Sequence, residues 1–173
     1  KTSIPCPGTE EILAKLEKHE SKSMHGQLPI VWDKAIDYSV FDKAGNKWID
    51  FTSTIFVANI GHSNQKVLDA ITRSIQKPLL SCYAYPNEIR AQYISELCKF
   101  AGKGFEKVFL LSAGTEATEA ALKLMRLAAQ EKGKEKGIII CIRNNWHGRT
   151  LGAQMMSSNK KQREWIGNIN FDI

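Results

Sequence analysis

Apolar residues recur at helical spacing in four stretches of the chain, and each stretch begins near a residue that can cap a helix. These patterns predict one helix from Thr9 to about Glu20 and a second from Ser63 to Lys77, ended by Pro78. A third starts at Asn87, and a fourth spans residues 115–131. The apolar faces of the last three are predicted at Val67, Leu68, Ile71 and Ile75; at Ile94, Leu97, Cys98 and Ala101; and at Ala117, Ala120, Ala121, Leu124 and Ala128.

Strand patterns fall into two groups. Residues 31–51 favour strands, and segments 38–42 and 47–51 flank Lys43-Ala44-Gly45-Asn46, which is a hairpin signal. Further on, residues 107–111 and 138–142 read as short buried strands around the fourth helix. The second of these, Ile-Ile-Ile-Cys-Ile, has no alternation, as expected in a parallel sheet covered on both faces. The predicted fold class is therefore α/β, a helix and β-hairpin segment followed by the start of a mostly parallel sheet flanked by helices.

Two polar loops follow the predicted parallel strands: Ser112-Ala113-Gly114-Thr115-Glu116-Ala117 and Trp146-His147-Gly148-Arg149-Thr150. A right-handed crossover places both loops at one sheet edge, where ligands of open α/β sheets bind. The first loop opens a helix whose N–H groups and dipole suit a phosphate. In the second, an aromatic ring and a guanidinium suit a planar ligand bearing a carboxylate.

Each loop also has a purely structural interpretation. Ser112 or Thr115 can serve as a plain helix cap, Glu116 and Glu119 are ordinary acids of a first turn, and Trp146 can be a packed aromatic beside a surface arginine. His62, in Gly61-His62-Ser63, is more often a loop or capping contact than a catalytic base.

Composition narrows the function classes. The 173 residues are 43% apolar and 24% charged, typical of a soluble globular protein, and the longest apolar run is far too short to span a bilayer. No leader is evident, and four cysteines without CxxC spacing favour reduced thiols in the cytoplasm. The net charge of +6 is spread along the chain and forms no basic stripe, so the charge does not favour a nucleic-acid partner. No pair of His or Cys residues has the spacing of metal ligands, so no metal site is predicted. Because the chain starts at Lys1 and stops without a helix cap, we expect a fragment or a processed product.

In order and spacing, a set of motifs resembles the N-terminal part of class III aminotransferases, which are pyridoxal-phosphate enzymes of fold type I. The motifs are Trp48-Ile49-Asp50-Phe51-Thr52-Ser53, Asn59-Ile60-Gly61-His62, the Ser112–Ala121 segment with Lys123 and Arg126, and Trp146-His147-Gly148-Arg149-Thr150. The resemblance implies that Gly114 and Thr115 bind the phosphate of pyridoxal 5'-phosphate (PLP). It implies that Trp146 stacks on the pyridine ring, where the family usually has Tyr or Phe, and that His147 supports this stack.

The same resemblance implies substrate contacts and a larger assembly. Arg149 would meet a substrate carboxylate, and Ile55 and Phe56 would line the substrate entrance. The partners would be a small-molecule amino donor, an amine or an ω-amino acid such as 4-aminobutyrate, and a keto acid such as 2-oxoglutarate. Users of acetylornithine, ornithine and β-alanine share much of this N-terminal pattern, so the donor stays open. The whole enzyme would be a homodimer, with residues 1–60 contributing to its small domain and 61–173 forming the first part of its large PLP-binding domain.

The chain departs from the family pattern at Ser53-Thr54, Ser63-Asn64 and Ser112-Ala113-Gly114, and the first departure can reshape the substrate pocket. No catalytic residue is expected in this segment, because the lysine that forms a Schiff base with PLP is expected beyond Ile173. Two other classes stay open: a non-catalytic scaffold with this fold, and a basic nucleic-acid-binding module suggested by the charge alone.

Overall fold

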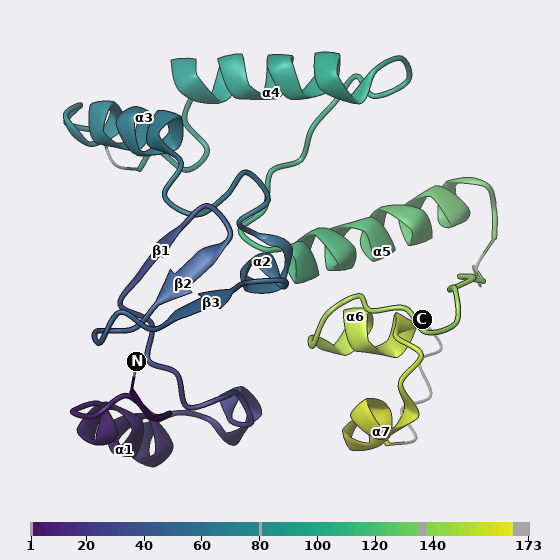
Figure 1. The fold of residues 1–173 in the computed structure, drawn as a ribbon. Helices are drawn as coiled ribbons and strands as arrows, with labels where there is room; N and C mark the ends of the chain where they lie inside the picture. The colour runs from purple at the N-terminus through teal and green to yellow at the C-terminus, as the bar shows by residue number, and fades with distance from the viewer. Residues whose placement is uncertain (1, 80, 135–137, 168–173) are drawn as a thin grey trace. The chain divides into compact units, whose positions relative to one another are not determined.

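The computed structural model describes residues 2–79, 81–134 and 138–167 (Figure 1). The chain divides into two compact units, Lys1–Tyr85 and Pro86–Ile173, and each is described by itself. The boundary expected between residues 60 and 61 concerns the domains of a whole enzyme, and it stays a prediction.

A small antiparallel sheet forms the centre of the first unit. Strands β1 (Lys34–Ile36), β2 (Ser39–Phe41) and β3 (Lys47–Ile49) lie in the order β1-β2-β3. Val40, on the middle strand, pairs with Ala35 and Trp48 and is 1% exposed. The predicted hairpin is thus confirmed.

The hairpin turn is tied to the start of the chain by buried polar groups. The Asn46 side chain donates to Asp42 Oδ2 (2.8 Å) and to Thr2 Oγ1 (2.7 Å). Burial raises the pKa of Asp42, but hydrogen bonds from Asn46, the Ala44 backbone and the Cys6 thiol outweigh it and lower the pKa overall. The hairpin turn is therefore held by the Asp42 carboxylate, which accepts several hydrogen bonds.

Helices of the first unit begin close to the predicted positions. Helix α1 (Glu10–His19) follows Thr9, as predicted, and η1 (Lys22–Met24) is a short 3-10 turn. Helix α3 (Gln65–Ile75) is capped by Asn64, whose Oδ1 accepts from Lys66 N at 3.1 Å. The prediction that Ser63 caps this helix is wrong, because its hydroxyl donates to Ala35 O on β1 (2.7 Å).

The second unit contains α4 (Glu88–Ala101), α5 (Gly114–Glu131), α6 (Leu151–Met156), α7 (Lys160–Arg163) and the 3-10 turn η2 (Glu164–Ile166). Helix α4 is capped as predicted, since Asn87 Oδ1 accepts from Arg90 N at 3.2 Å. The most buried side chains belong to the last turns: Ala153 is fully buried, and Gln154 accepts from Trp165 Nε1 at 2.6 Å. Among the described helices, none has the length and apolar character needed to cross a membrane.

The two predicted parallel strands do not form in the described part of the chain. Residues 107–111 and 138–142 have no strand pairing, and Ile138, Ile140 and Ile142 are 91%, 92% and 83% exposed. A strand needs a neighbour for its N–H and C=O groups, and the described residues offer none at these two segments. The antiparallel hairpin forms because its partner strands are adjacent in sequence.

The predicted apolar face of α5 is largely exposed in the structure. Leu124 is 57% exposed, whereas Thr115, Glu119, Leu122 and Arg126, on another face, are half-buried. The apolar face lies open because the sheet that was expected to cover it is not formed among the described residues. The polar face is covered by the α6 segment instead.

Candidate functional site

Helix α5 begins without a side-chain cap. Its N-cap residue is Ala113, which has no oxygen that can accept from the first-turn amides. The Glu116 carboxylate turns back to accept from Ser112 N (2.8 Å), one residue before the cap. The plain cap by Ser112 or Thr115 is thus absent, and the positive end of an 18-residue helix stays open to an anion.

The two predicted loops meet at Gly148 and Thr115. The backbone of Gly148 is buried at φ +135°, and a Cβ added there would lie 2.8 Å from Thr115 Cγ2. Such a distance is shorter than side chains tolerate, so only glycine permits this approach. The expectation that the loops lie together is confirmed by this contact.

Glu119 fastens the second loop to α5. Its Oε1 accepts from the Thr150 hydroxyl and from Ala153 N (3.0 Å), in the first turn of α6. Gly152 permits this, because a Cβ there would lie 2.7 Å from Leu122 Cδ2. Glu119 is therefore an anchor and not an ordinary first-turn acid; its position four residues after Thr115, on the same helix face, is the signal that points to it.

Hydrogen bonds also tie the start of the Trp146–Thr150 loop to the residues at the end of α6. Asn145 Nδ2 donates to Met156 O (2.9 Å), and Asn145 Oδ1 accepts from Ser158 N (2.8 Å). The buried Ser157 hydroxyl accepts from His147 N at 3.2 Å. Sequence reasoning missed Asn145 and Ser157, since their partners lie ten or more residues away and no periodicity links them.

Trp146 and Arg149 project from this closed loop. The Arg149 guanidinium lies over the Trp146 ring, 5.7 Å from its centroid, and the ring is 54% exposed. Cation–π contact holds a positive charge beside an accessible aromatic surface. His147 is half-buried at the foot of the loop. Gly114, Thr115, Trp146, His147 and Arg149 thus belong to one assembly, formed by the start of α5 and the loop against it.

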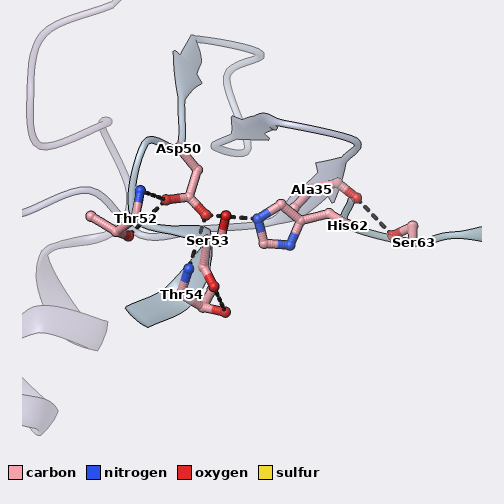
Figure 2. Close-up of polar contacts among 7 residues, drawn as sticks. All are labelled: Ala35, Asp50, Thr52, Ser53, Thr54, His62 and Ser63. Carbon is pink, nitrogen blue, oxygen red and sulfur yellow. Dashed lines mark hydrogen bonds and ion pairs between the residues drawn. The ribbon is translucent and has the colours of Figure 1, made fainter. Parts of the chain in front are cut away.

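Ile55 and Phe56 belong to the other unit. They lie in α2 (Ser53–Phe56), a single turn whose backbone has positive φ throughout, and they are 71% and 78% exposed. Asp50, just before this turn, pairs with His62 Nε2 at 2.8 Å (Figure 2). Hydrogen bonds from His62 and then Thr52 lower the pKa of Asp50 to about 2. His62 is therefore the partner of a carboxylate, which its sequence context did not indicate.

Comparison with known proteins identifies a family that this chain resembles. The family profile described as "Aminotransferase class-III" matches residues 21–171. The chain is 36% identical over 150 residues to an acetylornithine aminotransferase of Clostridium acetobutylicum, covering 86% of this chain and 38% of that protein. The chain thus spans well under half the length of this relative.

Solved structures agree with the sequence comparison. The ornithine aminotransferase of Toxoplasma gondii superposes with a TM-score of 0.82 at 25% identity, covering 97% of this chain and 41% of that chain. The acetylornithine aminotransferase of Elizabethkingia anophelis gives 0.72 at 31% identity, covering 90% and 38%. These neighbours have the fold of type I PLP enzymes, which confirms the predicted fold class, and the matched family is PLP-dependent. With nearly all of its length matched by one profile, this chain belongs to the class III aminotransferase family.

Proposed function

We propose that this chain is the N-terminal part of an aminotransferase that moves an amino group from an ω-amino acid to a keto acid such as 2-oxoglutarate, using PLP. The observation that carries the proposal is the docking of the Trp146–Thr150 loop against the uncapped start of α5, through Gly148 and Thr115. This contact puts an aromatic ring and a cation on the same assembly as an uncapped helix start, which would bind the phosphate.

The residues fit the cofactor. A Cβ built at Gly114 meets no atom within 4 Å, so the space beside this first helical residue is open. The first-turn N–H groups of Gly114 and Thr115 would bind the phosphate, and the exposed face of Trp146 would lie against the pyridine ring. PLP, when bound, supplies the electron sink for the amino transfer. The chain's own residues hold and orient the reacting molecules.

Arg149 would bind the carboxylate of the amino donor, with His147 supporting the loop from which it projects. The named relatives support ornithine-type donors, and 4-aminobutyrate is the alternative that has the same carboxylate and terminal amine. The proposal includes a homodimer, as the resemblance implies. It also includes a reducing compartment such as the cytoplasm, which the free state of Cys6, Cys82, Cys98 and Cys141 favours.

The test uses the full polypeptide that contains this chain, loaded with PLP. We expect a visible cofactor absorbance that changes when ornithine, N-acetylornithine or 4-aminobutyrate is added, and formation of glutamate when 2-oxoglutarate follows. A folded protein that binds PLP without transferring an amino group would be a scaffold, and one that binds no PLP would overturn the proposal.

The role of Arg149 has its own test. Arg149→Ala should lower kcat/KM for a carboxylate-bearing donor about tenfold more than for a simple alkyl amine, because only the former loses a charged hydrogen bond. Arg143→Ala, which removes another exposed arginine just before the loop, is the matched control. Equal losses for both donors would remove this role.

A further inference from the structure

A buried hydroxyl lies at the base of the Trp146–Thr150 loop. Ser157 directly follows helix α6 and is 2% exposed. Its hydroxyl accepts from His147 N (3.2 Å) and donates to Ala153 O (3.1 Å). A partly buried backbone N–H that loses its partner costs free energy, so this hydroxyl holds the backbone at His147 in place.

The side-chain amide of Asn145 ties the start of the loop to the same end of α6. Its Nδ2 donates to Met156 O (2.9 Å), and its Oδ1 accepts from Ser158 N (2.8 Å). A carboxylate offers only acceptors, so an aspartate here would lose the bond to Met156. Both ends of the amide group are therefore engaged, with backbone atoms on either side of Ser157.

Trp146 lies between these two attachments. The Asn145 side chain is bound just before it and the His147 N–H just after it, whereas the Trp146 ring is 54% exposed. Two residues further on, Gly148 rests on Thr115 in the first turn of α5. Because two residues span at most about 7 Å, the backbone that carries the ring is held close to the uncapped start of this helix.

We propose that Asn145 and Ser157 are positioning residues for the cofactor, which fix Trp146 so that its ring lies against the pyridine ring of PLP while the phosphate lies at the start of α5. The inference rests on the proposed function, and the contacts that carry it all lie within the second unit. Neither side chain touches PLP. Their loss therefore loosens the ring end of the cofactor and leaves the phosphate end, at Gly114 and Thr115, in place.

The experiment uses the full PLP-loaded polypeptide. Ser157→Ala and Asn145→Ala should each reduce the visible circular dichroism per bound PLP, because a ring held in one orientation gives a stronger signal than a ring that moves. The Kd of PLP should rise about tenfold, as expected when hydrogen bonds at a partly buried place are lost. The phosphorus NMR shift of bound PLP, which reports the phosphate end, should keep its wild-type value.

Ser158→Ala is the matched control, because it removes the neighbouring hydroxyl and keeps the backbone N–H that donates to Asn145. It should leave the circular dichroism and the Kd of PLP at their wild-type values. Ser157→Cys is the second variant if Ser157→Ala does not fold, since a thiol forms only weak hydrogen bonds. It should change the circular dichroism in the same direction as Ser157→Ala.

Hydrogen exchange of the full polypeptide without PLP provides a readout that does not depend on activity. The His147 amide should exchange faster in Ser157→Ala, and the Ser158 amide should exchange faster in Asn145→Ala. Wild-type circular dichroism in the folded, PLP-loaded variants would overturn the proposal, as would a joint change of circular dichroism and phosphorus shift, which indicates general damage. A wild-type protein that binds no PLP would instead refute the proposed function together with the role toward the cofactor, while the exchange rates would still decide whether Asn145 and Ser157 hold the loop.

Discussion

At the scale of single residues, Gly148 shows most clearly how the candidate site depends on backbone contact. Its φ is +135°, and its missing side chain lets the loop rest on Thr115. Any larger residue meets both an unfavourable backbone conformation and the Thr115 side chain, which itself stands at the proposed phosphate position.

Gly148→Ala should therefore weaken PLP binding and lower the unfolding midpoint. We expect a cost of about 1–3 kcal/mol from overpacking in addition to the backbone cost of about 1–2 kcal/mol. Cofactor titration and thermal unfolding of the full enzyme measure both effects. Gly104→Ala is the control, because Gly104 also has positive φ (+98°) but an added Cβ meets nothing within 4 Å. If the two variants behave alike, the contact with Thr115 has no role in binding the cofactor.

Sequence motifs identified two loops that lie together in the structure, but they did not identify the contacts between them. Gly114, Thr115 and Trp146 were identified from local patterns and from resemblance, because each motif is continuous in sequence. The Asp50–His62 pair joins residues 12 positions apart, and no helical or strand period links them. Their sequence context indicated only a loop histidine, and the pairing is visible only once β1 and the α2 turn are folded.

At the scale of elements, the starts of three helices were predicted well, whereas the formation of each predicted strand depended on whether a partner strand lay beside it. Helices α1, α4 and α5 start within a residue of their predicted positions, because capping and first-turn chemistry are local. The hairpin β2–β3 is local too. The segments 107–111 and 138–142 would need parallel partners that are distant in sequence. An apolar run alone therefore does not decide whether either segment forms a strand.

The packing of α6 on α5 gives the element-scale prediction. Glu119 is the side chain that links them by hydrogen bonds, so Glu119→Ala should loosen the Trp146–Thr150 loop by about 1–2 kcal/mol. Glu119→Gln keeps an acceptor and should lose less. PLP affinity and quenching of Trp fluorescence by PLP measure the change in the full enzyme.

Glu131→Ala is the matched control for Glu119, since it removes the same charge from the far, exposed end of the same helix. It should leave PLP affinity at the wild-type value. A loss of affinity as large as that of Glu119→Ala would show that the charge of α5 matters and that the link to Thr150 and Ala153 does not.

At the scale of the whole molecule, the chain covers 38% of the length of its Clostridium relative and contains the proposed phosphate and ring contacts. Neither of the two site loops contains a lysine. A PLP-dependent aminotransferase needs a lysine that bonds covalently to the cofactor. Under the proposed function, the α5 assembly would hold the cofactor and a lysine outside these two loops would bond to it.

Covalent trapping tests this division. Borohydride reduction of the full PLP-loaded enzyme fixes the cofactor to the lysine that holds it, and mass spectrometry of the peptides then identifies that residue. We expect the label outside residues 1–173, and we expect it to persist in Lys123→Arg, which alters an exposed lysine on α5. A sample reduced without PLP shows the background. Label on Lys123, or on any other lysine of this chain, would contradict the expectation that the bonding lysine lies outside residues 1–173.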